Sequence, residues 1–254
     1  MLSSKTKTLL RKLSQKKHRK EMNAFTVEGV KGVQEALVHA DVLMLVVDGA
    51  KREEKDITTL VTQAEQRDIL VEFAGRKDIA AIKQTETFPG ITAVVAMPEP
   101  EYDNIFDADT ILVLDRINDP GNLGTIIRTA DWFGVHTIIL SEGSVDPYNE
   151  KVVRSTMGSI FRVHIIQTHN IVEMVETLKE NRYSIAALDL AGTNIQKSKK
   201  TKKQALIFGS ESHGVSDALK SLVDETYTIP GKGGAESLNL AVSVAIALYI
   251  TSLQ

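Results

Sequence analysis

The chain has 254 residues, of which 43% are hydrophobic and 25% charged, with a formal net charge of −3 and no cysteine. The lack of cysteine excludes a disulfide-stabilised secreted protein, a thiolate metal site and a cysteine nucleophile. The composition is that of a folded protein, and the length favours two domains.

Charge is distributed unevenly along the chain. The first twenty residues carry eight cations and no acid, a net charge of +8. Because the whole chain has a net charge of −3, the other 234 residues carry −11. Leu9, Leu10 and Leu13 are set among basic residues, so this arm lacks the unbroken apolar run of an export signal. The longest apolar stretch, Leu238 to Leu253, is shorter than the roughly 20 residues that span a membrane. We therefore expect a cytoplasmic protein with no membrane segment.

Residues 1–97 are expected to form an α/β domain, because β-branched runs alternate with helical patterns there. The predicted strands are 24–29, 42–48, 68–73 and 90–97, and the predicted helices are 30–40 and 56–67. Residues 98–109 contain two prolines and five acids with little periodicity, which predicts a linker.

Residues 110–254 are expected to form a second, complete α/β domain. Its predicted elements include strands at 110–115, 136–140, 205–208 and 226–230, a helix through 128–133 and a closing apolar helix. A run of five lysines between Lys197 and Lys203 is either a solvated loop or a nucleic-acid contact.

Three segments of the second domain place small and polar residues after predicted strands, where open α/β sheets bind ligands. The first is NDPGNLGTIIRTA, residues 118–130. Its Asp-Pro-Gly suits a tight turn, and Asn122 is a good helix N-cap. A purely structural role does not account for Arg128, a cation in an otherwise apolar helix.

The second segment is FGSESHG, residues 208–214. Ser212 stands three residues after Gly209, so the spacing of a nucleophile elbow fails. Ser212 beside His213 does not rescue a hydrolase, because neighbours in sequence rarely point at each other, and His213 is interpreted as an incidental loop residue. Glu211, a carboxylate between glycines, is the better functional candidate.

The third segment, residues 229–249, joins a glycine-rich loop to the closing helix, and either Ser237 or Asn239 is positioned to cap that helix. The Gly-Lys-Ser/Thr ending of a P-loop is absent, as is a G-x-G-x-x-G after a strand. No group of His, Asp and Glu has metal-ligand spacing, so no metal is expected.

In this order and spacing, the three segments resemble the motifs of the SpoU family of RNA ribose 2′-O-methyltransferases, within the SPOUT superfamily. The matching residues are NDPxNxGxxxRTA at 118–130, GxExxG at 209–214, and IP at 229–230 leading to SLN at 237–239. Residues 151–163 look like the family's segment between the first two motifs. The first domain is similar to the L30e-like substrate-binding domain that many members carry. Gly231 stands where many members have methionine.

The resemblance implies a parallel sheet whose C-terminal stretch threads a loop to make a trefoil knot, and an active site completed by a homodimer. The closing helix, Leu240 to Leu253, suits either that interface or burial in its own domain. The implied cofactor is S-adenosylmethionine, held by Gly209, Ile229 and Leu238.

The implied catalytic residues are Arg128, Asn122, Glu211, Ser237 and Asn239. A guanidinium with a pKa above about 12 is a poor proton acceptor, so we expect Arg128 to fork onto the phosphate beside the target ribose. We expect the Asn and Ser side chains to hold the ribose and the first-motif loop, and Glu211 to orient Arg128.

The expected substrate is RNA, and the extra front domain favours ribosomal over transfer RNA. The basic residues of the arm would neutralise phosphates and give salt-dependent affinity. They are Lys5, Lys7, Arg11, Lys12, Lys16, Lys17, Arg19 and Lys20. The alternative is a catalytically silent RNA-binding protein that keeps the fold, although such a protein would be free to lose the catalytic side chains that are present here.

Overall fold

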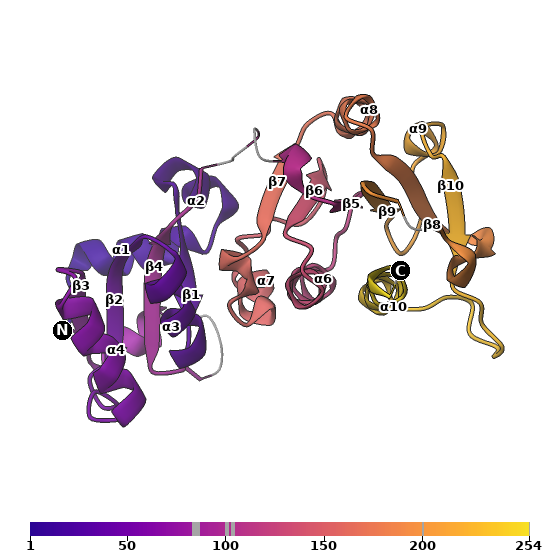
Figure 1. Cartoon of the computed structure of the whole chain (residues 1–254). Coiled ribbons are helices and arrows are strands. Elements are labelled where there is room, and N and C mark those ends of the chain that lie inside the picture. The colour runs from indigo at the N-terminus through magenta and orange to yellow at the C-terminus, as the bar shows by residue number, and fades with distance from the viewer. Residues whose placement is uncertain (83–86, 100–101, 103–104, 200, 254) are drawn as a thin grey trace. The chain divides into compact units, whose positions relative to one another are not determined.

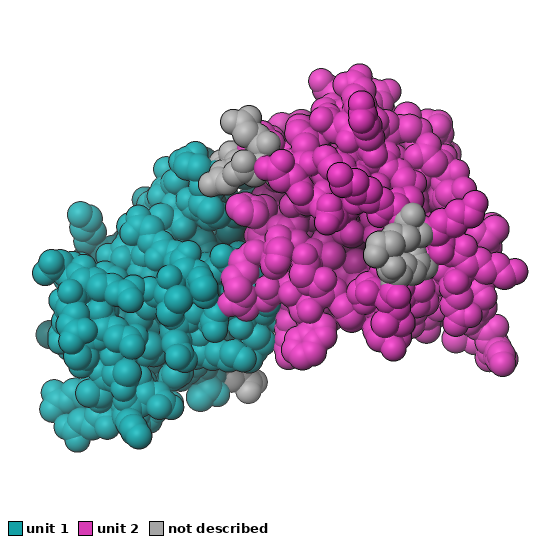
Figure 2. Space-filling model, viewed as in Figure 1, with its two compact units in different colours: residues 1–99, 148–161 teal, residues 100–147, 162–254 magenta. Residues whose placement is uncertain are grey.

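The computed structural model describes residues 1–82, 87–99, 102, 105–199 and 201–253. The chain divides into two compact units, each with its own sheet (Figure 1, Figure 2). The first unit comprises residues 1–99 and 148–161, and the rest of the chain forms the second. The segment 148–161, which the sequence assigns to the second domain, therefore packs with the first unit.

The first unit is built around a four-stranded sheet in the order β1-β4-β2-β3. Its elements up to residue 99 are α1 (Ser4–Leu13), α2 (Lys16–Met22), β1 (Ala24–Glu28), α3 (Val30–His39), β2 (Val42–Asp48), α4 (Lys55–Glu65), β3 (Leu70–Ala74), α5 (Arg76–Ile82) and β4 (Ile91–Ala96). β4 is antiparallel to β1 and β2, whereas β2 and β3 are parallel. β2 is almost continuously buried, as expected of a central strand covered on both faces.

The basic N-terminal segment belongs to the core of this unit and is not a free arm. α1 is amphipathic and buries Leu10 and Leu13 in a cluster with residues of β1, β2 and β4. Arg19 is only 3% exposed and donates to the carbonyl oxygens of Leu13 and Ser14, both at 2.9 Å. This cation therefore stabilises the turn between α1 and α2.

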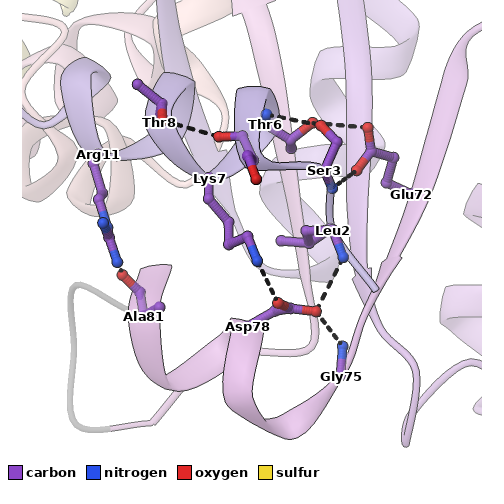
Figure 3. A network of polar contacts seen from close by, with 11 residues as sticks. Leu2, Ser3, Thr6, Lys7, Thr8, Arg11, Glu72, Gly75, Asp78 and Ala81 are labelled. Carbon is purple, nitrogen blue, oxygen red and sulfur yellow. Dashed lines mark hydrogen bonds and ion pairs between the residues drawn. The ribbon is translucent and has the colours of Figure 1, made fainter.

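Two more cations of the segment contact α5 (Figure 3). Lys7 forms an ion pair of 3.0 Å with Asp78, and Nε of Arg11 donates to the carbonyl oxygen of Ala81 at 3.3 Å. Lys7, Arg11 and Arg19 thus bind protein, which corrects the expectation that all eight cations face RNA. The cations of the segment that remain exposed without an α5 contact are Lys5, Lys12, Lys16, Lys17 and Lys20.

Asp78 joins the chain's beginning to α5 and makes folding of this unit sensitive to acid. Hydrogen bonds from the backbone N–H of Leu2, the ammonium of Lys7 and the backbone N–H of Gly75 lower the pKa of Asp78 from 3.8 to about 2. A lowered folded-state pKa stabilises the protein above pH 3.8, and this contribution is lost as the pH falls through about 2. In urea titrations across this range, Asp78→Asn is expected to flatten the decrease in the free energy of unfolding. An unchanged pH profile would contradict this role.

The segment 148–161 carries α7 (Glu150–Thr156) and the 3₁₀ helix η2 (Ser159–Phe161). The ring of Phe25 in β1 lies 4.8 Å from that of Tyr148 and 6.3 Å from that of Phe161, measured between centroids. Arg154 forms an ion pair of 3.6 Å with Glu28, whose pKa is raised by burial. Aromatic and ionic contacts together fix the segment on β1.

The second unit contains a six-stranded sheet in the order β10-β8-β9-β5-β6-β7, with every described pairing parallel. Its elements are η1 (Ile105–Asp107), β5 (Thr110–Leu114), α6 (Pro120–Trp132), β6 (Thr137–Ser141), β7 (His164–Thr168), α8 (Ile171–Glu180), β8 (Ser184–Asn194), η3 (Ile195–Lys197), β9 (Gln204–Phe208), α9 (Asp217–Lys220), β10 (Glu225–Thr228) and α10 (Leu240–Ser252). In the predicted linker 98–109, residues 100–101 and 103–104 lie outside the described residues, and Ile105 is buried in the core of this unit.

Helices cover both faces of this sheet, which confirms the predicted α/β class. α8 and α9 lie on one side, and α6 and α10 lie together on the other (Figure 1). In β5, Ile111 and Val113 pack into the cluster that includes residues of α8 and α9, while the alternate residues Leu112 and Leu114 are buried on the opposite face. No helix in the described part of the chain is long and apolar enough to cross a membrane.

Candidate active site

The loops that follow β5, β9 and β10 meet at one edge of the large sheet, because parallel strands end on the same side, and residues 188–190 of β8 lie beside them. The first of these loops leads into α6. Asp119 is the N-cap of this helix, and its side chain accepts from the backbone N–H of Asn122 at 2.7 Å. The prediction that Asn122 caps the helix is therefore wrong. Because Asp119 fills that role, the amide of Asn122 is available for contacts outside the helix.

A hydrogen-bonded chain of side chains connects all three motif segments. Nδ2 of Asn239 donates to Oδ1 of Asn122 at 2.9 Å, and Nδ2 of Asn122 donates to Oε1 of Glu211. Oδ1 of Asn239 also caps α10 by accepting from the backbone N–H groups of Ala241 and Val242. Because the cap requires Oδ1 of Asn239 to face α10, the NH₂ group of Asn239 faces Asn122 and donates to its side-chain oxygen. The NH₂ group of Asn122 is then left to donate to the Glu211 carboxylate.

Arg128 does not contact Glu211 in this structure. Its side chain is exposed and makes no hydrogen bond or ion pair with the residues that the structure describes. Arg128 lies six residues after Asn122, which places it about 9 Å further along α6 and on a different side of the helix. Glu211 therefore orients Asn122, and Arg128 presents a free guanidinium to solvent.

Beside this network lies a cleft of about 640 Å³, within the roughly 300–1,000 Å³ typical of small-molecule sites. It contains the three predicted cofactor contacts, Gly209, Ile229 and Leu238, together with Glu211 and Ser237. Its other lining residues are Leu188, Asp189, Leu190, Phe208, Ser210, Gly214, Tyr227, Thr228, Pro230, Gly231, Gly233, Ala235, Glu236, Leu240, Ser243 and Ile246. The lining combines apolar side chains with exposed backbone, which suits a ligand that is partly aromatic and partly polar.

The glycines around the cleft differ in what a side chain would meet. A Cβ on Gly209 would lie 1.9 Å from the carbonyl carbon of Gly214, so only glycine fits this turn. In contrast, a Cβ on Gly231, Gly233 or Gly234 would meet nothing within 4 Å. Glycine is therefore required by the close approach of two backbone segments at Gly209, whereas no close contact requires it in the exposed third loop.

Ser212 and His213 do point at each other, contrary to expectation, with 2.7 Å between Oγ and Nδ1. The backbone N–H of His213 donates to Oγ of Ser210, so the tight turn brings the neighbouring side chains together. Among the described residues no carboxylate hydrogen-bonds the His213 ring, and Glu211 is engaged by Asn122. The pair thus lacks the acid that orients the histidine in a hydrolase triad.

The sequence pattern of the SpoU rRNA Methylase family matches residues 109–249, which is more than half of the chain. The chain belongs to the SpoU rRNA methylase family. In addition, the pattern of an MRM3-like substrate binding domain matches residues 5–93, within the first unit. The resemblance noted from the three motifs is confirmed.

Relatives of this SpoU protein match it over nearly its whole length. The 23S rRNA (guanosine(2553)-2′-O)-methyltransferase RlmP of Bacillus subtilis is 36% identical, over 94% of this chain and 92% of the relative. A solved structure of a putative RNA methyltransferase of the TrmH family from Porphyromonas gingivalis is 31% identical, with a TM-score of 0.86 and coverage of 99% and 98%. The SpoU methyltransferase AviRb from Streptomyces viridochromogenes, solved in complex with AdoMet, is 28% identical, with a TM-score of 0.87 and the same coverage.

Two residues of the SpoU cleft, Tyr227 and Asp189, were not singled out by the sequence motifs. The backbone N–H of Lys199 donates to the hydroxyl of Tyr227, and burial raises the pKa of Tyr227. This contact holds the backbone of Lys199 beside a residue that lines the cleft. Asp189 is a single acid in the otherwise apolar sequence ALDLAG in the middle of β8, and an isolated acid in an apolar strand is the sequence signal that could have identified it. Within the described residues, no group of three or more His, Asp or Glu side chains is arranged to hold a metal ion.

Proposed function

We propose that this protein transfers a methyl group from S-adenosylmethionine to a ribose 2′-hydroxyl of ribosomal RNA. The observation that supports this most directly is the chain from Asn239 through Asn122 to Glu211, which joins the three SpoU motifs beside a cleft with a backbone-lined wall. The names of RlmP and of AviRb, a structure with AdoMet bound, agree with this chemistry. Ribosomal RNA is favoured over transfer RNA because RlmP and a second relative are both named for 23S rRNA.

The residues of the cleft fit the proposed cofactor. S-adenosylmethionine supplies a methyl group that is already activated by its positively charged sulfur. Gly209 and the turn around it offer backbone amides and carbonyls to the adenosyl part, while Ile229 and Leu238 supply apolar contacts. The protein has only to align the acceptor oxygen with the methyl group, so that positioning provides much of the rate acceleration.

Arg128 is assigned to the RNA and not to proton removal. Its guanidinium is unpaired among described residues, and a planar fork of N–H donors matches a phosphate group. Holding the phosphate beside the target nucleotide would orient the ribose, and a phosphate oxygen would be positioned to take the hydroxyl proton. Asn122, Ser237 and Asn239 would hold the ribose and the first loop by hydrogen bonds, with Glu211 fixing the amide of Asn122.

Two measurements test the proposed function. Calorimetric titration with S-adenosylmethionine should show one saturable site per chain, whereas a catalytically silent relative that has lost the cofactor would show none. A map of 2′-O-methyl positions across ribosomal and transfer RNA, from cells with and without the protein, should then reveal a methylation that depends on it. Loss confined to transfer RNA would refute the ribosomal assignment.

The exposed cations of α1 and α2 are proposed to bind RNA phosphates. Replacing Lys12, Lys16 and Lys20 together by alanine is expected to reduce the slope of log K against log salt by about one for each lost phosphate contact. The cause is that fewer counterions are released on binding. Filter binding of a ribosomal RNA fragment at several salt concentrations measures the slope. The matched triple arginine variant keeps the charges and should keep the slope, and an unchanged slope in the alanine variant would exclude these residues.

The proposal includes the family's trefoil knot, a homodimer and a cytoplasmic location. α10 carries apolar side chains on all of its sides, yet its Val242 and Tyr249 are exposed, and so are Leu253 directly after it and Trp132 of the adjacent α6. An all-apolar helix is normally buried, which supports a second chain covering this face.

The dimer is tested by placing a charge on this face. Tyr249→Asp is expected to convert a two-chain species into a single chain in sedimentation velocity, because a carboxylate would be desolvated at the interface. The matched control is Val38→Asp on α3, which introduces the same charge at another exposed apolar position. A variant that stays dimeric would rule out this face as the interface.

A further inference from the structure

The charged side chains that line the cleft all have the same sign. Asp189, Glu211 and Glu236 line it, and no Lys, Arg or His is among the described lining residues. Glu211 is engaged by the amide of Asn122, whereas Asp189 belongs to a different element of the lining, the middle of β8. The charged side chains of the lining therefore contribute only negative charge to the cleft.

Asp189 is held rigidly and has its counter-ion outside the cleft. Its Oδ1 accepts from the backbone N–H of Ala191 at 3.1 Å, which fixes the carboxylate in a local turn. Its Oδ2 lies 3.9 Å from Nζ of Lys220 in α9, a residue that does not line the cleft and also lies 4.0 Å from Asp217. Asp189 lines the cleft, its side chain is 31% exposed, and its carboxylate lies near a cation that it shares with Asp217.

The proposed reaction changes the charge of the ligand that occupies this cleft. The ribose oxygen forms a bond to the methyl carbon, the carbon–sulfur bond breaks with its electron pair left on sulfur, and the hydroxyl proton leaves to phosphate or solvent. The donor carries a positive sulfur, whereas the product S-adenosylhomocysteine has a neutral one. Donor and product otherwise share the same skeleton, so a charged wall is a means of telling them apart.

We infer that Asp189 makes the cleft prefer the charged methyl donor to its neutral product, and that Lys220 sets how strong this preference is. This inference rests on the proposed function. The carboxylate attracts the donor's positive charge and has no such effect on the product sulfur. In a partly solvated cleft, one such charge is worth about three- to tenfold in affinity. Asp189 thereby limits inhibition by the product and promotes its exchange for new donor.

The test compares the dissociation constants of donor and product by calorimetry. Asp189→Asn keeps the oxygen that accepts from Ala191 and removes only the charge. It is expected to lower the preference for S-adenosylmethionine over S-adenosylhomocysteine by about three- to tenfold, mainly by weakening the donor. Sinefungin carries an amine in place of the methyl-bearing sulfur centre and therefore keeps the positive charge. Its affinity should fall in Asp189→Asn by about as much as that of S-adenosylmethionine.

Lys220 provides a test with the opposite sign. Lys220→Met removes the cation behind Asp189 and should raise the preference for the donor, but should have no such effect when combined with Asp189→Asn. The control is Glu180→Gln, which removes an exposed charge of α8 that does not line the cleft, and it should leave the ratio unchanged. Thermal denaturation of each variant checks that it is folded.

The possible outcomes distinguish the inference from the proposed function. If Asp189→Asn weakens donor and product equally, or leaves both unchanged, the inference is overturned while the cofactor assignment stands. If the affinity for sinefungin is as insensitive to Asp189→Asn as the affinity for S-adenosylhomocysteine, the preference arises from the shape of the methylsulfur centre and not from charge. That result also overturns the inference. Wild-type protein that binds neither ligand would refute the proposed function itself.

Discussion

Replacing Arg128 with alanine is expected to lower methyl transfer to ribosomal RNA by about 10²- to 10³-fold, as for other single groups that position or stabilise reacting charge. The side chain is exposed and unpaired among the described residues, so its removal should cost little folding stability. It also lies outside the cofactor cleft, so S-adenosylmethionine should bind as in the wild type. Single-turnover transfer to RNA and calorimetric titration of the donor separate the two effects.

Two further variants make the Arg128 result specific. Arg128→Lys keeps the charge and loses the planar fork, so it should recover only part of the rate if bidentate phosphate contact is the cause. Thr125→Ala changes an exposed residue one turn earlier on α6 and should be neutral. Normal transfer by Arg128→Ala would remove this residue from the mechanism and leave the cofactor site unaffected.

Replacing Gly209 with alanine is expected to weaken donor binding by about 100-fold, which corresponds to about 2.7 kcal/mol and lies within the roughly 1–3 kcal/mol that overpacking costs. The added Cβ would lie 1.9 Å from the carbonyl carbon of Gly214 and 2.1 Å from the backbone nitrogen of Val215. Both are backbone atoms across the same turn, so relief requires the turn itself to open. That turn also carries Glu211, and the network to Asn122 would be disturbed with it.

The matched control for Gly209 is another glycine of the same cleft. A Cβ on Gly231 meets nothing within 4 Å, so Gly231→Ala should bind the donor as the wild type does. Calorimetry gives the affinities, and thermal denaturation shows whether Gly209→Ala remains folded. Equal affinities in the two variants would show that the close approach between Gly209 and Gly214 is not needed for the cofactor.

Local patterns predicted part of the secondary structure of both units. β-branched runs predicted the strands of the small sheet and β5, β6, β9 and β10 of the large one, but not β7 or β8. The cap of α10, Asn239, was one of the two residues expected from the sequence. The same local reasoning placed the cap of α6 at Asn122, where the structure has Asp119. Both residues are good caps by type, and a choice between neighbours depends on backbone angles that no propensity fixes.

Contacts between distant segments were not predictable in this way. The basic composition of residues 1–20 suggested a free RNA-binding arm, but Arg19 is buried and Lys7 pairs with Asp78. The expected contact from Glu211 to Arg128 is replaced by one to Asn122. Lys7 and Asp78 lie far apart in the sequence, as do Asn122 and Glu211, and composition carries no information about which distant group a charge will meet.

By itself, the sequence determined the α/β class and the three SpoU motifs, because strand and turn preferences act over a few residues. It also brought those motifs to one edge of the sheet, since the ends of parallel strands lie on the same side. Only the tertiary structure decided that Asn239, Asn122 and Glu211 form one hydrogen-bonded chain. It also decided that Asp189 lines the cleft with its carboxylate 3.9 Å from Nζ of Lys220. These arrangements depend on side-chain positions within about an ångström, which are set by packing of the whole unit and not by any local segment.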